Sequence, residues 1–170
     1  YGSINIGATT GEWTYTLNND SPETQAIEEG QSVTESFIAR VTDDNGAYVD
    51  QTITVTIDGT NDVPVVTNSA SDAADTAVEA GNNDDGSTVD GTSSISGTLS
   101  SSDFDTSATS TWSIEGTPST TYGSINIDAT TGAWTYTLNN DSPETQALEE
   151  GQSVTESFIA RVTDDNGAYV

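Results

Sequence analysis

The strongest constraint on the fold is an internal repeat. The first 49 residues return at 122–170 with three changes, which are Gly7 to Asp128, Glu12 to Ala133 and Ile27 to Leu148. A period of 121 residues has the size of a domain and exceeds the roughly 20–50 residues of a solenoid repeat. The sequence therefore predicts a window on a tandem array. Residues 1–62 are expected to be the C-terminal part of one repeat, and residues 63–170 the following repeat without its last strand.

Several segments alternate apolar and polar residues with a period of two, as half-buried strands do. Examples are WTYTL at 13–17 and TITVTID at 52–58. In the segment SFIARV, the same alternation predicts that Phe37, Ala39 and Val41 are buried. The second copy repeats these patterns, and further strands are expected at Val63–Thr67, Ile95–Leu99 and Trp112–Ile114.

One short helix is expected in each repeat. Ser21 suits the N-cap, Pro22 the first helical position, and Gly30 the end of the helical region. Ser142 and Gly151 repeat that design in the second copy. About seven short strands per repeat, separated by turn residues, are typical of a sandwich. The predicted fold is an all-β, immunoglobulin-like (cadherin-like) β-sandwich in tandem repeats.

The charge balance points to cations as partners. The chain has 28 acidic residues against two arginines, a net charge of −26, and neither His nor Cys. Such a charge disfavours nucleic acid and anionic membranes. The missing His and Cys exclude disulfides, thiolate metal sites and imidazole ligands. Oxygen ligands remain, and these suit calcium, which takes roughly six to eight of them.

Candidate calcium ligands cluster at strand ends and in turns. They are Asp58, Asn61 and Asp62 at the boundary; Asp43, Asp44 and Asn45, repeated as Asp164, Asp165 and Asn166; Asp103 and Asp105; and Glu79, Asp84 and Asp85. No EF-hand loop and no RTX nonapeptide pattern is present. Asp-Asn-Gly is also a common turn signal that needs no metal, and acidic residues also keep a surface soluble, so both interpretations stay open.

The motifs WTYTL, QA(I/L)EEG, TESF, VTDDNG and the closing GTND resemble those of a known family. They are similar to the VCBS-type, cadherin-like immunoglobulin repeats of giant bacterial RTX adhesins. The resemblance covers nearly all of both copies and fails mainly at 68–94. It implies an extracellular location on a bacterial surface after type I secretion, and a role in cell adhesion. It also implies calcium ions within repeats and at the boundary around Asp58, Asn61 and Asp62.

Three classes of function compete. The first is a structural extender that calcium makes rigid and that projects a distal ligand-binding domain. The second is a glycan- or ice-binding module that uses exposed Thr52, Thr54 and Thr56 or an exposed Trp112. The third is an enzyme, which is disfavoured because the chain lacks His and Cys and its serines have no evident base partner.

Neighbouring repeats are the expected protein partners. The second copy stops before the equivalent of the strand at 50–58, which predicts an open sheet edge. Because the copies are nearly identical, strand 50–58 of another chain is expected to be able to pair with that edge. In the same way, residues 1–62 are expected to be able to pair with early strands from a neighbouring chain.

Overall fold

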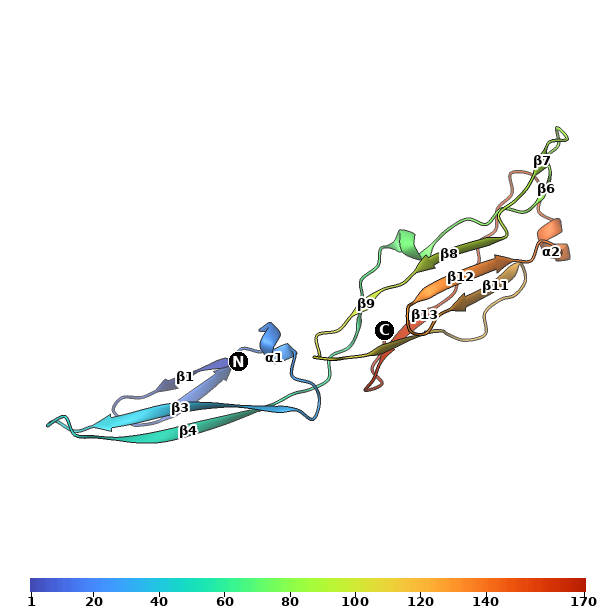
Figure 1. Ribbon diagram of the computed structural model, residues 1–170. Helices are drawn as coiled ribbons and strands as arrows, with labels where there is room; N and C mark the ends of the chain where they lie inside the picture. The colour runs from blue at the N-terminus through green and yellow to red at the C-terminus, as the bar shows by residue number, and fades with distance from the viewer. The chain divides into compact units, whose positions relative to one another are not determined.

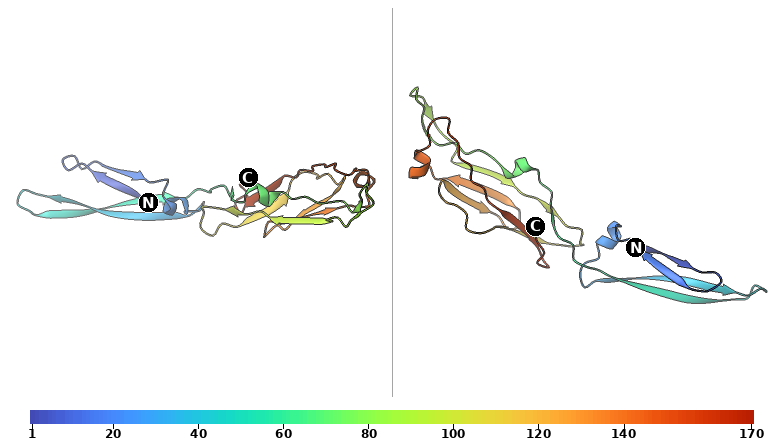
Figure 2. Two further views of the ribbon diagram at one scale, coloured as in Figure 1. Left: turned by 90° about the horizontal axis from the view of Figure 1, so that it is seen from above. Right: turned by 180° about the vertical axis from the view of Figure 1, so that it is seen from behind.

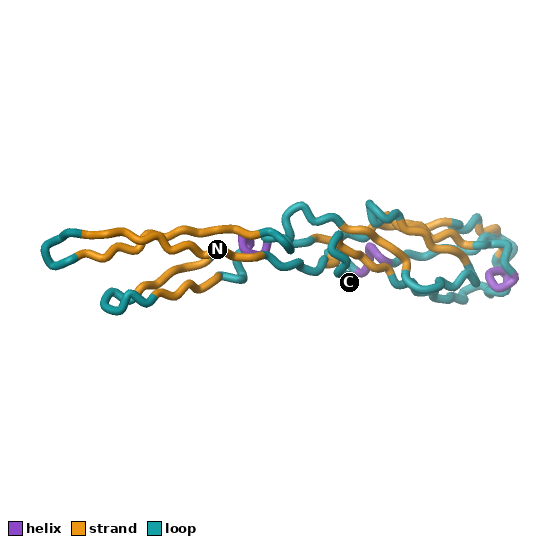
Figure 3. Tube along the Cα trace, turned by 90° about the horizontal axis from the view of Figure 1, so that it is seen from below, coloured by secondary structure: helices purple, strands orange, loops and turns teal.

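The computed structural model describes residues 1–170 and is all-β apart from three short helical segments (Figure 1). Strands and loops account for almost the whole trace (Figure 3). The strands of the first half are β1 (Gly2–Ile6), β2 (Trp13–Leu17), β3 (Ser32–Thr42) and β4 (Tyr48–Asp58). Those that follow are β5 (Val65–Val66), β6 (Gly81–Asn82), β7 (Thr88–Val89), β8 (Ser94–Thr98), β9 (Ser101–Ser102), β10 (Ser110–Ile114), β11 (Gly123–Ile127), β12 (Ala133–Leu138) and β13 (Ala160–Asp164). The helical segments are α1 (Pro22–Gln25), η1 (Ala70–Ala73) and α2 (Pro143–Gln146). None of the helices is long and apolar enough to cross a membrane.

The chain divides into two compact units. Unit 1 consists of Tyr1–Asp62 together with the loop Asp103–Ala108. Unit 2 consists of Val63–Ser102 and Thr109–Val170. By its contacts the loop Asp103–Ala108 therefore belongs to unit 1, although the residues on either side of it in the sequence belong to unit 2.

Unit 1 is built from two antiparallel hairpins. β1 pairs with β2, from Gly2 opposite Leu17 to Ile6 opposite Trp13, and β3 pairs with β4 over the full length of both strands. The hairpins lie in separate layers (Figure 2, left). Tyr15 and Phe37 meet between them, with ring centroids 6.1 Å apart.

Unit 2 repeats β1, β2, α1 and part of β3 as β11, β12, α2 and β13, and adds strands to their edges. β11 pairs with β12 in the register of β1 and β2, and β8 extends that sheet on the other edge of β12. β10 pairs with β13, so that Trp112 lies opposite Val162. Short pairs of β5 with β9 and of β6 with β7 complete the unit.

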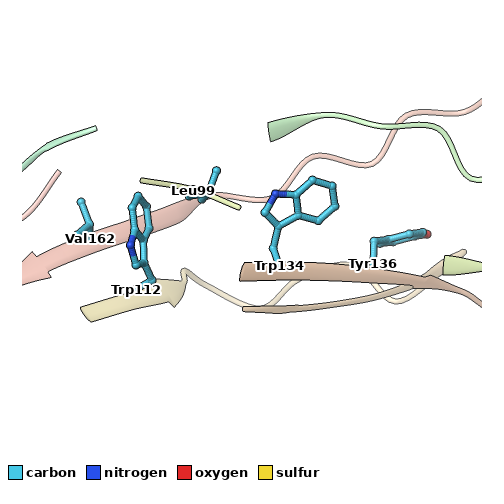
Figure 4. Close-up of a cluster of buried hydrophobic side chains, with 5 residues drawn as sticks. All are labelled: Leu99, Trp112, Trp134, Tyr136 and Val162. Carbon is cyan, nitrogen blue, oxygen red and sulfur yellow. The ribbon is translucent and has the colours of Figure 1, made fainter. Parts of the chain in front are cut away.

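The hydrophobic core cluster lies in unit 2. Its buried members come from three strands and the residue after β8, and they are Leu99, Trp112, Trp134, Tyr136 and Val162 (Figure 4). Phe158 packs against this cluster, with its ring centroid 5.9 Å from that of Tyr136. The inward-facing residues of the alternating strands therefore form the core of unit 2.

The helix prediction is confirmed at its start and corrected at its end. The Ser21 side chain accepts a hydrogen bond from the Thr24 N–H, and Pro22 is the first helical residue. The helix ends at Gln25, however, and Gly30 lies in a later turn with φ of +82°. Ser142 caps α2 in the same way, and Gly151 is likewise in a turn, at φ +79°.

One burial prediction is wrong, and one feature of the glycan- or ice-binding alternative is excluded. Val41 is 66% exposed, because no strand covers the edge of β3 that β10 covers on β13. Trp112 is only 6% exposed and belongs to the core, so it is not available as a contact residue for glycan or ice. Thr52, Thr54 and Thr56 are exposed, as a solvent-facing strand surface requires.

Candidate cation site

Three carboxylates that the sequence places in two separate clusters come together in unit 1. Asp62 lies four residues after the end of β4, and Asp103 and Asp105 follow β9. The Asp62 N–H donates to Asp105 Oδ2 at 2.8 Å, and the Asp105 N–H donates to Asp103 Oδ1 at 3.1 Å. Backbone hydrogen bonds thus fix the carboxylates relative to one another across 43 residues of sequence.

Contacts with the turn after α1 hold this cluster in place. The Thr106 hydroxyl donates to the carbonyl of Ala26 at 2.9 Å. The Gly59 N–H donates to the Gln31 carbonyl at 2.9 Å, and a Cβ on Gly59 would collide with the backbone at Ile27. Glycine is therefore required at that position for close approach of two backbones.

The loop that carries Asp103 and Asp105 contains a strained residue. Ser107 has φ of +65° and is the sole residue other than glycine with positive φ. Residues with a side chain rarely adopt this left-handed conformation unless the surrounding structure imposes it. The loop conformation is thus fixed by its contacts with unit 1.

The cluster lacks the positive charge that its burial requires. Asp105 is 8% exposed, and its Oδ1 atom is buried with no hydrogen-bond partner. Burial raises the pKa of Asp62, and the negative charges of Asp105 and then Asp103 raise it further. A buried carboxylate without a partner is costly, and a nearby cation or a proton relieves that cost.

The two arginines of the chain are both engaged elsewhere. Arg40 forms a two-point ion pair with Asp50, with Nε 2.7 Å from Oδ1, and stacks over the ring of Tyr48. Arg161 lies 3.0 Å from a carboxylate oxygen of Glu115. Neutralisation of the carboxylates around Asp105 therefore calls for a proton or for a cation from solution.

The donor atoms suit a hard cation, although the carboxylates alone do not complete a coordination shell. No group of three or more acidic side chains is gathered closely enough to hold a metal ion by itself. Calcium accepts carbonyl oxygens and water beside carboxylates. The orphaned Oδ1 of Asp105 is an oxygen donor of the kind that calcium takes, and any further ligands would have to come from carbonyl groups and water.

The other two boundary residues, Asp58 and Asn61, also make hydrogen bonds. Asp58 is exposed, and its Oδ1 accepts from the Ser32 hydroxyl at 2.6 Å across the β3–β4 pair. The Asn61 side chain donates to the carbonyl of Asp62 at 2.7 Å. Asp58 and Asn61 thus flank the cluster in sequence, while Asp62 carries the link to Asp105.

The TDDNG turns form hydrogen bonds that account for their acidic residues. Asp43 Oδ1 accepts from the N–H groups of Asn45 and Ala47, and Asp44 Oδ1 accepts weakly from the Asn45 side chain at 3.4 Å. These contacts form a side-chain-capped hairpin turn, with Gly46 at φ +85°.

The second copy of this turn differs in its surroundings. Asp164 is 7% exposed, and its Oδ1 accepts from the N–H groups of Asn166 and Ala168. Asp165 Oδ1 accepts from the Thr109 N–H at 3.2 Å. In unit 2 the turn is thus linked to the segment that leads into β10.

Glu79, Asp84 and Asp85 lie in unit 2 and make separate contacts. Glu79 accepts from the Gln146 side chain at 2.9 Å, and the Asp84 N–H donates to Glu150 Oε2 at 2.8 Å. Asp85 Oδ1 accepts from the Ser87 N–H, and the hydrogen bonds from Ser87 lower the pKa of Asp85. The contacts of Asp85 satisfy a turn.

Sequence reasoning missed a pair of partly buried tyrosine–carboxylate contacts. The Tyr136 hydroxyl donates to Glu156 Oε2 at 2.6 Å, and Tyr15 forms the same bond to Glu35 in unit 1. Burial raises the pKa of both tyrosines, and the carboxylate partners raise it further. The partners are 20 residues apart, so no local motif predicts the pairing. The one signal in the sequence is that the alternation of WTYTL and of TESF places the tyrosine and the glutamate on the inward faces of their strands.

Comparison with models of protein families, with curated proteins and with solved structures finds no match for this chain.

Proposed function

We propose that the chain is a structural extender of a large bacterial surface adhesin, built from immunoglobulin-like sandwiches that calcium stiffens at their boundary. In this proposal the protein is exported from the cell, and its domains act as spacers that hold a distal ligand-binding domain away from the cell surface. The near-perfect sequence repeat supports a spacer, because a spacer is useful many times whereas a ligand-binding head is needed once.

The layered hairpins of unit 1 and the two-faced core of unit 2 support the sandwich part of the proposal. In unit 1 an aromatic pair, Tyr15 with Phe37, lies between the two hairpins, and in unit 2 Tyr136 of β12 contacts Phe158, which precedes β13. Two antiparallel sheets with an aromatic interior are the arrangement of an immunoglobulin-like sandwich.

The observation that carries the calcium part is the buried, unpartnered Oδ1 of Asp105. It lies beside Asp62, whose pKa is raised by burial and by Asp105 and Asp103. In a chain of net charge −26 whose arginines are paired elsewhere, a divalent ion converts this repulsion into attraction. The ion would link the segment after β4 to the loop after β9, both of which belong to unit 1.

The energetic gain is modest for one ion. Extracellular calcium modules bind with Kd of roughly 0.1–1 mM. At about tenfold excess of free calcium over Kd, one site stabilises the folded state by about 1.4 kcal/mol. This is enough to shift a boundary equilibrium about tenfold toward the rigid arrangement.

Calorimetric calcium titration with matched variants tests the proposal. Asp105→Asn removes one charge and one ligand atom with little change in shape, and we expect it to weaken calcium binding at least tenfold. Asp85→Asn removes the same charge from a turn and serves as the control, with an expected change below twofold. Small-angle scattering should show a more flexible particle after chelation of the unmodified chain. Equal affinities for the two variants, or scattering that ignores the chelator, would refute the proposal.

A further inference from the structure

The TDDNG turns contain the two Asn-Gly bonds of the chain, Asn45–Gly46 and Asn166–Gly167. Both asparagines are exposed to solvent. No other asparagine of the chain precedes a glycine. An asparagine in this position can lose its side-chain amide spontaneously, because glycine has no Cβ to hinder attack by its backbone nitrogen. The two turns are therefore the places where this chemistry is most accessible.

The reaction needs only water as a co-reactant. The backbone nitrogen of Gly46 loses its proton and bonds to Cγ of Asn45, while the Cγ–Nδ2 bond breaks and ammonia leaves. Water then opens the resulting cyclic succinimide at one of its two carbonyl carbons. The product is aspartate or isoaspartate, and isoaspartate carries an additional methylene group in the main chain. Each event adds one negative charge to the protein.

The geometry of the first turn can be assigned from its hydrogen bonds and its φ angles. The Gly46 N–H donates to the Asp43 carbonyl at 3.2 Å and closes a β-turn. Asp44 and Asn45 are the central residues of this turn. Neither of them has a positive φ, whereas turns of types I′, II and II′ each require one. The turn is therefore of type I, in which ψ of the third residue is about 0°.

A closed type I turn and formation of the succinimide exclude each other. With ψ of Asn45 about 0°, the nitrogen of Gly46 eclipses the backbone nitrogen of Asn45. Ring closure requires the same Gly46 nitrogen to eclipse Cβ of Asn45, because only then can it reach Cγ. The backbone nitrogen and Cβ are different substituents of Cα. The Gly46 nitrogen must therefore rotate away from the Asp43 carbonyl before it can attack.

An aspartate side chain keeps each turn closed. Asp43 Oδ1 accepts hydrogen bonds from the Asn45 N–H at 2.9 Å and from the Ala47 N–H at 2.8 Å. Asp164 makes the same two contacts in the second copy, at 3.0 Å and 2.8 Å. The glycine N–H donates to a backbone carbonyl in both turns. The carboxylate is thus placed to hold the turn rather than to take the proton of the attacking nitrogen.

We propose that Asn45 and its equivalent Asn166 are sites of spontaneous deamidation. The turn aspartates, Asp43 and Asp164, are positioning residues that set the rate by keeping the type I turn closed. Each asparagine reacts only while its turn is open, so its deamidation records how often the turn has opened. Isoaspartate lengthens the main chain within the turn, and this disrupts the hydrogen bond from the Asp43 N–H to the Ala47 carbonyl.

Peptide mapping of the full chain after incubation at neutral pH tests the proposal. Trypsin cleaves after Arg40 and Arg161, the two basic residues, so the two turns are recovered on different peptides. The unfolded reference is one synthetic peptide, VTDDNGAYV, whose sequence occurs at 41–49 and again at 162–170. Mass spectrometry measures the replacement of the side-chain NH2 by OH, and isoaspartyl methyltransferase quantifies isoaspartate. The variant Asn45→Gln gives the background from the other asparagines of its peptide.

We expect both asparagines to deamidate about tenfold or more slowly in the folded chain than in the peptide, because only the open fraction of each turn reacts. Asp43→Ala should accelerate deamidation of Asn45 several-fold and leave that of Asn166 unchanged in the same molecule. Asp43→Ser keeps a hydroxyl that can accept the same N–H groups, so it should recover part of the protection.

The matched control is Ser32→Ala, which removes the 2.6 Å hydrogen bond to Asp58 at the opposite end of the β3–β4 hairpin. It should leave the rate at Asn45 unchanged, whereas an equal acceleration would show that loss of stability in unit 1, and not the turn, sets the rate. Equal rates in the folded chain and the peptide would show that the turn does not restrain the reaction. A slower reaction in Asp43→Ala would show that the carboxylate acts as a base. Each of these results would overturn the proposal.

Discussion

Replacement of Val162 by Ala, compared with the same change at Val41, measures how much the covering strands contribute. The two residues occupy equivalent positions of the repeat, but their exposures are 0% and 66%. Val162→Ala removes two buried methyl groups, which corresponds to about 1.6 kcal/mol of lost burial. The cavity that remains beside Trp112 raises the total to about 2–3 kcal/mol. Val41→Ala changes a largely solvated side chain, so its expected cost is within about 0.5 kcal/mol.

Urea denaturation separates the two effects when each unit has its own signal. In a Trp13→Phe background, fluorescence reports only Trp112 and Trp134, both of which belong to the core of unit 2. With a slope of about 1–2 kcal/mol/M, Val162→Ala should lower the fluorescence midpoint by about 1–3 M. Val41→Ala should leave both this midpoint and the far-ultraviolet circular dichroism curve within error of the parent. Equal losses at the two positions would show that the edge of β3 is covered in solution and would refute the reasoning.

Three further perturbations have defined outcomes. Burial and the carboxylate of Glu35 raise the pKa of Tyr15 to about 12 from an ordinary value of 10. The stability contributed by the neutral phenol is therefore complete below pH 10 and is lost as the pH rises toward 12. In melting curves recorded at different pH values, Tyr15→Phe should reduce the loss of stability above pH 10. Hydrogen bonds from Thr131 lower the pKa of Asp128, so its contribution is present above an ordinary pKa of 3.8 and lost as the pH falls through the depressed value; Asp128→Ala should lower the melting temperature at pH 7 and narrow its difference from the parent at pH 2. Gly97→Val in the full chain forces a side chain against Trp134 and should destabilise unit 2 by about 1–3 kcal/mol in urea denaturation.

Local features of the fold could be predicted from the sequence because their causes are local. The capped start of α1 depends on Ser21 and Pro22, which are adjacent in sequence. The alternation within β2 and β12 follows from the period of a strand, and the predicted segment at Trp112–Ile114 lies within the observed β10.

Burial of particular positions could not be predicted, because it depends on which edges are covered. Val41 and Val162 have the same sequence neighbours on either side, yet only Val162 lies opposite a residue of β10, whereas Val41 pairs with Val49 of β4. The burial of Trp112 is explained by its pairing with Val162 of β13. The alternation in one sequence predicts on which face of a strand a side chain lies, but it does not predict whether another strand covers that face.

The candidate cation site shows the same division. The acidic residues were identifiable by type and by their position at strand ends, but Asp62 and Asp105 are 43 residues apart and were assigned to different clusters. Their association depends on the loop Asp103–Ala108, which joins unit 1 by its contacts. The turn residues Asp43 and Asp85, by contrast, have hydrogen bonds that turn chemistry alone explains.

The near identity of the β1–β2 and β11–β12 hairpins has a consequence for how an array of such repeats assembles. During folding, a stretch such as 94–114 meets two almost interchangeable docking sheets, one on each side of it in the sequence. If the stretch paired with the sheet of the wrong repeat, the product would be compact, but the sheet of the correct repeat would lack its partner strands. Only three substitutions distinguish the competitors, among them Ala133 in the docking strand itself, so the connectivity of the chain must supply most of the discrimination. Repeats this similar therefore trade ease of duplication against a risk of frame-shifted folding, and the order in which they leave the ribosome or the export channel becomes part of what specifies the native structure.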